Sequence, residues 1–106
     1  MIFNLGYFHK SASKYTTEIS RCKTISSLKR LHATMDNPDL IVYSKLIKKS
    51  GKLRDIGYCK ELMARIKQKR IKPDAALYGI LFHAFNQNYC PQIADEYLQR
   101  MIHIDN

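Results

Sequence analysis

Four lysines near the middle of the chain have a type and spacing that suit contact with phosphate groups. They stand at i, i+3, i+4 and i+7, and are Lys45, Lys48, Lys49 and Lys52. This spacing places all four on one face of a helix, in a row about 10 Å long at a rise of about 1.5 Å per residue. No acidic residue between Asp39 and Asp55 neutralises this lysine row. The row predicts contact with a phosphate backbone, and the alternative is a solvated helix face on which the charges repel one another.

No other group of residues has the spacing that catalysis or metal binding needs. The histidines and cysteines are His9, His32, His83, His103, Cys22, Cys59 and Cys90. The histidines fit no metal-ligand motif, and the cysteines are more than thirty residues apart, unlike a paired zinc site or a secreted disulfide framework. The chain also has no glycine-rich phosphate loop. We therefore predict no enzymatic activity, no metal and no cofactor, and we expect Cys59 to be a small core residue.

The positive charge is concentrated in one part of the chain. The 106 residues carry 18 Lys and Arg against 9 Asp and Glu, which gives a net charge of +9. Residues 40–74 alone hold eleven bases and three acids, whereas residues 75–106 have a net charge of −2. Such a concentration predicts an anionic partner for the middle of the molecule. No apolar run approaches the ~18 residues of a membrane span, so we expect no membrane partner.

The elements that must position these residues follow a 35-residue period. Tyr43 is followed by Tyr78, and Pro38-Asp39 by Pro73-Asp74, at this offset. The offset also relates two pairs of apolar stripes: Val42, Tyr43, Leu46 and Ile47 with Leu77, Tyr78, Leu81 and Phe82, and Cys59, Leu62, Met63 and Ile66 with Ala94, Tyr97, Leu98 and Met101. A fixed period between about 20 and 50 residues is typical of a solenoid. The predicted fold class is therefore all-α, a solenoid of antiparallel helix-turn-helix repeats.

The period divides the chain into three units. They are a degenerate N-terminal repeat at 1–39, a well-defined repeat at 40–74, and a second, incomplete repeat at 75–106. The helices expected in the last two units span about 41–49, 54–69, 76–86 and 91–102. Because glycine permits a tight turn, we expect the first two of these helices to be joined at Ser50-Gly51.

The N-terminal unit is less regular than the other two. At the same register, Leu28 and Leu31 take the places of Met63 and Ile66, while the polar Thr24 and Ser27 take the places of Cys59 and Leu62. A weak apolar stripe is typical of a terminal repeat, which faces solvent on one side. The first seventeen residues contain no acid and resemble an organellar presequence in composition. The alternative is that they form an ordinary first helix of the domain.

Residues 40–74 and their repetition from residue 75 resemble the pentatricopeptide repeat, the 35-residue helix-turn-helix unit of organellar RNA-binding proteins. The matching residues are Tyr43, Leu46-Ile47, Cys59 with Ala94, Leu62-Met63, Ile66 with Met101, and Pro73-Asp74. The chain departs from the family pattern at Gly51, which is displaced, and at Arg70, which replaces a glycine. The tetratricopeptide repeat fits less well, because its period is 34 residues and because Ile47 and Ile66 stand where that family has small residues.

The resemblance implies a right-handed solenoid whose first helices line a concave face that holds single-stranded RNA, one base per unit. In residues 40–74 the base edge would meet Ser44 and Asp74, a pair similar to the family's guanine-preferring combinations. The base would lie between the second-position side chains, Ile41 and Ala76. The lysine row would contact RNA phosphates from the same face. Helix capping and solvation are the alternative roles for Ser44 and Asp74.

The resemblance further implies an RNA-binding component of a mitochondrial or chloroplast ribonucleoprotein, with protein subunits as additional partners. The alternative is a helical-repeat adaptor for protein–protein interaction, with Tyr89 and Tyr97 as exposed aromatic side chains on an acidic last unit. An uncapped apolar face around Tyr97 and Met101 also predicts self-association through the C-terminal repeat. A steep salt dependence of binding would favour RNA over a protein partner.

Overall fold

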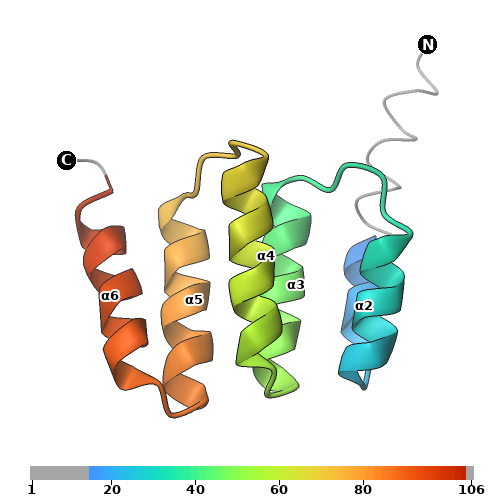
Figure 1. Ribbon diagram of the computed structural model, residues 1–106, viewed down its shortest axis with the longest axis horizontal. Helices are drawn as coiled ribbons and strands as arrows, with labels where there is room; N and C mark the ends of the chain where they lie inside the picture. Colours follow the sequence, from blue (N-terminus) through green and yellow to red (C-terminus); the bar gives the residue numbers. More distant parts are fainter. Residues whose placement is uncertain (1–14, 105–106) are drawn as a thin grey trace.

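The computed structural model describes residues 15–104, and the regular secondary structure in this range is entirely α-helical (Figure 1). Residues 15–21 are helical, and the helices that follow are α2 (Ile25–Ala33), α3 (Leu40–Lys52), α4 (Ile56–Gln68), α5 (Ala75–Gln87) and α6 (Pro91–Ile102). The predicted all-α class is confirmed. Within the described range, no helix is both long enough and apolar enough to cross a membrane.

The helices repeat at the 35-residue offset of the sequence. α5 begins and ends 35 residues after α3, and α6 begins 35 residues after α4. The N-cap carboxylates of Asp39 and Asp74 each accept a hydrogen bond from the backbone N–H three residues later, at 2.9 and 2.8 Å. Arg54 and Tyr89, in the turns that follow α3 and α5, have left-handed φ angles of 67° and 64°. The period of the sequence is therefore also a period of the backbone.

The turn inside residues 40–74 lies later than the glycine predicted. α3 continues through Ser50 and Gly51, and the chain turns at Leu53 and Arg54. The predicted turn at Ser50-Gly51 is therefore wrong. Gly51 is buried, and a Cβ atom placed on it would lie 2.7 Å from the Cβ of Ala84 on α5. A glycine stands here because α3 and α5 approach too closely for a side chain.

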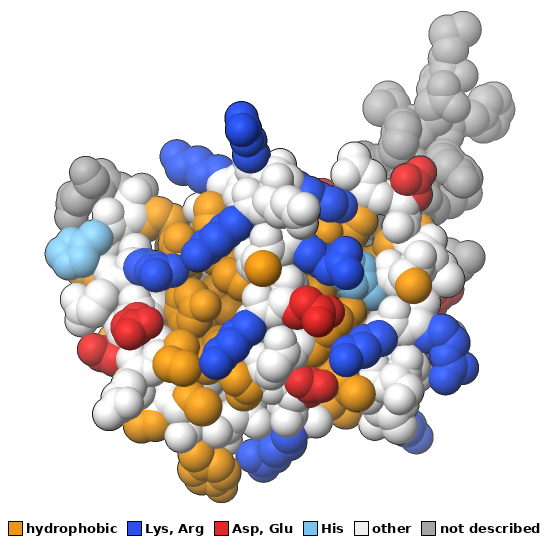
Figure 2. All heavy atoms as spheres, in the orientation of Figure 1, with side chains coloured by type: hydrophobic (Ala, Val, Ile, Leu, Met, Phe, Trp, Pro, Cys, Tyr) orange, Lys and Arg blue, Asp and Glu red, His pale blue; other side chains and the backbone are white. Residues whose placement is uncertain are grey.

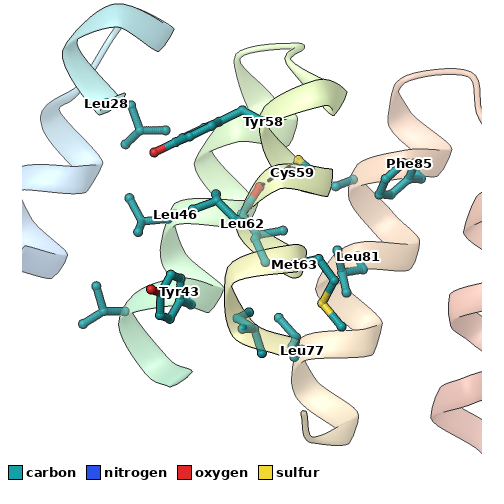
Figure 3. Packing of buried hydrophobic residues seen from close by; sticks show 14 of the residues in the cluster. Leu28, Tyr43, Leu46, Tyr58, Cys59, Leu62, Met63, Leu77, Leu81 and Phe85 are labelled. Carbon is teal, nitrogen blue, oxygen red and sulfur yellow. Dashed lines mark hydrogen bonds between the residues drawn. The ribbon is translucent and has the colours of Figure 1, made fainter. Parts of the chain in front are cut away.

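The apolar stripes pack into one core between the helices (Figure 3). Both predicted stripes of residues 40–74 are buried, namely Val42, Tyr43, Leu46 and Ile47 on α3, and Cys59, Leu62, Met63 and Ile66 on α4. The stripes on α5 and α6 are covered less completely, because only Leu77, Leu81 and Ala94 among their predicted members are buried. This difference follows from the packing: α3 contacts both α4 and α5, whereas α6 contacts α5 alone among the described helices.

Cys59 is the small core residue that the sequence predicted. Its side chain is completely buried, and its Sγ lies 3.6 Å from the backbone carbonyl oxygen of Ile47, to which it donates a hydrogen bond. Burial raises the pKa of the thiol to about 12. The group therefore stays protonated at neutral pH and acts in packing rather than as a nucleophile.

The N-terminal unit follows the period only in part. α2 ends 35 residues before α4, but it begins about one helical turn later than the period requires. Thr24 and Ser27 explain the late start, because they form a capping box in which the Ser27 N–H donates to Thr24 Oγ1 at 3.1 Å. Leu28 is buried as predicted, whereas Leu31 is only half-buried. The two polar residues that interrupt the apolar stripe thus set the start of the helix.

Successive helices run antiparallel and stand in a row, with α4 in front of α3 in the view of Figure 1. The molecule measures 46 × 35 × 20 Å along its principal axes. The presequence-like segment at residues 1–17 falls almost entirely outside the described residues, and so does His9.

Candidate nucleic-acid interface

The lysine row lies on one face of α3, beside the helix at residues 15–21. All four lysines line a hollow of about 180 Å³, and the opposite wall is Thr16, Ile19 and Ser20. The helical spacing in the sequence therefore does bring the four side chains to one place. Three of them, Lys45, Lys48 and Lys52, are exposed.

Lys49 differs from the other members of the row. It is half-buried, and its Nζ donates a hydrogen bond to the backbone carbonyl oxygen of Ser20 at 2.9 Å. Ser20 lies in the last turn of a helix that ends at residue 21, where the carbonyl dipoles favour a cation. Lys49 thus links α3 to the preceding helix, and three exposed ammonium groups remain for a ligand.

A second hollow, of about 320 Å³, lies between α3 and α5 and is called the α3–α5 hollow below. Lys48 and Lys52 line its α3 side. The α5 side contains no lysine, arginine or acid, and consists of Ala76, Gly79, Ile80, His83, Ala84 and Gln87. No acidic residue of the described range lines either hollow. Lys48 and Lys52 therefore stand between two hollows on the same side of the molecule.

The α5 side of this hollow includes the four positions that are equivalent to the lysine row in the next repeat. At the 35-residue offset, Lys45, Lys48, Lys49 and Lys52 correspond to Ile80, His83, Ala84 and Gln87. A cationic wall therefore faces a neutral, partly apolar wall. These two walls suit the two parts of a nucleotide. The phosphate binds ammonium groups, and the base stacks on apolar or aromatic side chains.

The sequence motifs gave no site role to His83 or Gln87, which the structure places opposite Lys48 and Lys52. The signal that identifies them is the period itself. His83 and Gln87 stand 35 residues after Lys48 and Lys52, for which a phosphate contact is predicted. The period therefore predicts that the same face of α5 belongs to the site. The motifs did not reveal them because neither residue has a charge or belongs to a ligand pattern.

The predicted base-recognition residues do not all meet in one hollow. Ala76 lines the α3–α5 hollow with Lys48 and Lys52, but Ile41, Ser44 and Asp74 are absent from its lining. Ile41 is 65% exposed, so it is free to contact a ligand from solvent.

Ser44 and Asp74 each make a hydrogen bond within their own helix. Ser44 Oγ donates to the carbonyl oxygen of Leu40 at 2.8 Å, and Asp74 Oδ1 caps α5 by accepting from the Leu77 N–H at 2.8 Å. The capping role considered as the alternative for Asp74 is therefore real. Its side chain is nevertheless exposed, and the second carboxylate oxygen remains open to a ligand.

The two tyrosines assigned to a protein-docking surface have different surroundings. Tyr89 is 85% exposed, as predicted. Tyr97 is half-buried, with its ring centroid 5.4 Å from that of Phe85 and 6.3 Å from that of Tyr78. The guanidinium of Arg100 covers the same ring at 5.5 Å from the centroid. The prediction that Tyr97 is an exposed aromatic is therefore wrong, because α5 supplies the packing partners.

No protein-family model, curated protein or solved structure matches this chain. The pentatricopeptide resemblance therefore stays a prediction that rests on the residues quoted above. The described residues also contain no group of three or more His, Cys, Asp or Glu side chains placed to hold a metal ion.

Proposed function

We propose that the helical repeats form a right-handed solenoid of the pentatricopeptide type and that the α3 face binds single-stranded RNA. The observation that carries this proposal is the α3–α5 hollow, in which Lys48 and Lys52 face the neutral wall of Ile80, His83 and Gln87. Phosphates lie along the lysine row, and a base enters the hollow beside it. The concentration of positive charge in residues 40–74 supports an anionic ligand at this place.

The binding mode follows from the individual side chains. Lys45, Lys48 and Lys52 contact successive phosphates, because their ammonium groups are exposed and no acid lines the hollows beside them. Ile80 and the His83 ring offer apolar and aromatic contact to a base in the α3–α5 hollow. Ser44 and Asp74, which do not line this hollow, meet the base edge as the family resemblance implies, and Asp74 accepts hydrogen bonds from a guanine.

The cellular setting is part of the same proposal. One pair of well-formed repeats contributes little sequence specificity, because a mismatched base contact changes the binding free energy by about 1–3 kcal/mol. We therefore place the protein in a mitochondrial or chloroplast ribonucleoprotein, in which other subunits add contacts. The second candidate is a protein-docking adaptor, which the exposed side chains of Tyr89 and Ile102 favour. Self-association through the uncapped C-terminal repeat is a separate prediction that is compatible with either candidate, and sedimentation over a wide concentration range tests it.

The experiment is the binding of a labelled, unstructured single-stranded RNA at two salt concentrations. The test variant carries Lys45→Gln, Lys48→Gln, Lys49→Gln and Lys52→Gln. The control variant loses the same charge at exposed lysines that line neither hollow: Lys23→Gln, Lys60→Gln, Lys67→Gln and Lys72→Gln. We expect the slope of log affinity against log salt to fall by about 0.7 for each phosphate that the test variant no longer binds. The control variant keeps its slope.

Two results would contradict the proposal. Equal reductions in both variants would mean that net charge, and not the lysine row, attracts the RNA. Negligible RNA binding by the wild-type protein would direct attention to protein partners and to the surface around Tyr89.

A further inference from the structure

A third hollow lies between α2 and α4 and shares no residue with the two beside the lysine row. It has a volume of about 220 Å³ and is lined by Lys29, His32, Ala33, Met35, Pro38, Tyr43, Arg65 and Lys69. We call it the α2–α4 hollow. Figure 2 shows a histidine side chain between α2 and α4, with Lys and Arg side chains and an acidic side chain around it, on the face that α4 presents to the viewer.

Three cations converge on this hollow. The Nζ of Lys29 lies 5.2 Å from the ring centroid of Tyr58, and the Nζ of Lys69 lies 5.5 Å from that of Tyr43. Arg65 is the third cation in the lining. None of the three forms an ion pair or donates a hydrogen bond to a residue within 15–104. Helix C-termini favour cations by their dipole, but Lys69, at the C-cap of α4, covers an aromatic ring and donates no hydrogen bond to a helix carbonyl group. Lys29 covers a second ring in the same way.

The inner wall adds neutral polar groups. His32 Nδ1 lies 2.6 Å from the Tyr58 hydroxyl oxygen, and the His32 ring contacts the Tyr43 ring edge to face at 5.8 Å between centroids. The hydroxyls of Tyr43 and Tyr58 point toward the side on which α2 lies (Figure 3). The Tyr43 hydroxyl is buried and has no hydrogen-bond partner in the described residues. A buried donor without a partner is rare in folded proteins and calls for a water, an ion or a ligand to bind it.

We propose that the α2–α4 hollow binds a phosphate group in its dianionic form, with Lys29, Arg65 and Lys69 as charged donors and the Tyr43 hydroxyl as a neutral donor. The guanidinium supplies a planar fork for two phosphate oxygens, and the ammonium groups supply point charges. Glu61 acts on His32, and Glu61 and Asp55 act on Tyr58, but no acid in the described part of the chain lines the hollow itself. The three cations that do line it suit a multiply charged anion such as a phosphate monoester or inorganic phosphate.

This site is independent of the proposed RNA interface. A phosphodiester chain carries one charge per nucleotide, and the lysine row matches such a chain by its length, whereas the cations here line one hollow between α2 and α4. The experiment uses inorganic phosphate as the first probe and a nucleoside 5′-monophosphate as the second. Equal affinity for both assigns the site to the phosphate group alone, and tighter binding of the nucleotide assigns it to a phosphate ester.

Histidine NMR signals of the full chain report on the site directly. Phosphate is titrated at constant ionic strength against chloride, and the ring signals of His32 are followed with those of His103 as the internal control, because His83 lines the proposed RNA-binding hollow. We expect a saturable change at His32 and none at His103. Burial, Arg65 and Lys69 lower the pKa of His32 in the free protein, while Glu61 acts in the opposite direction. A bound phosphate offsets the two cations, so the pKa of His32 rises on binding.

Two double variants separate a built site from general charge. Arg65→Gln with Lys69→Gln removes two donors, and Lys60→Gln with Lys67→Gln removes the same charge from exposed positions of α4 outside the hollow. We expect affinity for phosphate to fall about tenfold or more in the first variant and to change little in the second. Should the first variant fail to fold, Lys29→Gln provides the same test at an exposed position on α2.

The Tyr43→Phe variant separates specific phosphate binding from non-specific screening of charge by salt, because it changes no charge. It removes the unpartnered hydroxyl, so we expect unfolding without phosphate to be unchanged or shifted to higher temperature, and phosphate to stabilise it less than the wild type. The proposal is overturned if chloride shifts the His32 signals as phosphate does, or if the two double variants bind phosphate equally.

Discussion

Residues 40–74 and 75–104 have equivalent first helices and turns but different surfaces. α3 and α5 have equal lengths, equivalent aspartate caps and equivalent left-handed turn residues. On the face where α3 carries four lysines, α5 carries Ile80, His83, Ala84 and Gln87. The comparison teaches that apolar stripes and caps specify the repeat, while the exposed face of each first helix is free to acquire its own chemistry.

The two units also differ in how closely neighbouring atoms pack against the glycine in their first helix. Gly51 on α3 meets Ala84 of the next unit, whereas Gly79 on α5 has only the Met101 sulfur nearby, 3.6 Å from a Cβ placed on it. Two glycines inside equivalent helices therefore have opposite effects on stability. The first is required for packing, and the second is a helix residue that weakens its own segment.

The largest expected effect comes from replacing these two glycines. Gly51→Ala forces α3 and α5 apart and should lower the free energy of unfolding by about 1–3 kcal/mol. Gly79→Ala makes an ordinary contact with Met101 and should raise it by about 0.5–1 kcal/mol, the difference in helix propensity. Urea denaturation followed by circular dichroism measures both. Equal changes in the two variants would show that the close approach at Gly51 is absent in solution.

The second expected effect concerns the charge difference between the two faces. His83→Lys with Gln87→Lys extends the lysine row onto α5, opposite Lys48 and Lys52. If RNA lies in the α3–α5 hollow, binding of two further phosphates should steepen the salt dependence by about 1.4 in the logarithmic slope. Discrimination between bases should fall, because the neutral wall is removed. Filter binding of homopolymeric single strands checks both results, and an unchanged slope would place the RNA elsewhere.

The sequence predicted the helices of residues 40–102 to within about three residues at each end, because helix formation depends on neighbours within a few residues. The apolar stripes of α3 and α4 are buried as their spacing required. Three features could not be found this way. The role of Gly51 depends on Ala84, 33 residues away, and the burial of Tyr97 depends on Tyr78 and Phe85 of the preceding helix. The late start of α2 comes from a side-chain cap that the repeat pattern conceals.

The candidate site was predictable to a similar extent. The 3.6-residue period of a helix brings the lysine row together whatever the fold, and the structure shows the four side chains at one hollow. The second wall was not predictable from α3 alone, because it depends on which helix packs beside it. Residues such as Gln87 have no chemical signature of their own and become part of a site only through this packing.

A smaller effect distinguishes capping from recognition at Asp74. Asp74→Asn keeps an N-cap acceptor, so stability should stay within about 0.5 kcal/mol of the wild type, whereas Asp74→Ala should lose about 1 kcal/mol. If the free carboxylate oxygen reads a guanine, both variants should bind a guanine-containing strand less tightly than the wild type. The equivalent cap of α3, the first helix of the preceding repeat, provides the control, because Asp39→Asn should alter neither property. A guanine preference that survives Asp74→Asn would restrict Asp74 to capping.

The smallest expected effect compares the boundaries on the two sides of residues 40–74. The boundary with α2 contains the half-buried His32, bonded to Tyr58, whereas the boundary with α5 is the apolar contact around Gly51 and Ala84. Burial first, and then Arg65 and Lys69, lower the pKa of His32 in the folded protein, with Glu61 opposing them.

Because the folded pKa of His32 lies below the unfolded value of about 6.5, the unfolded chain binds more protons in the interval between the two. The stability contributed by neutral His32 is therefore present above about pH 6.5 and is lost as the pH falls toward the lower, folded pKa. Thermal unfolding of wild-type protein and of His32→Gln between pH 7.5 and 5 measures this contribution, with His103→Gln as the control for loss of an exposed histidine. The wild type and the control should lose stability in this interval more steeply than His32→Gln does. Parallel curves of stability against pH for all three proteins would mean that protonation of His32 does not weaken the contact with α2. The contacts with α2 and α5 would then respond to acid alike.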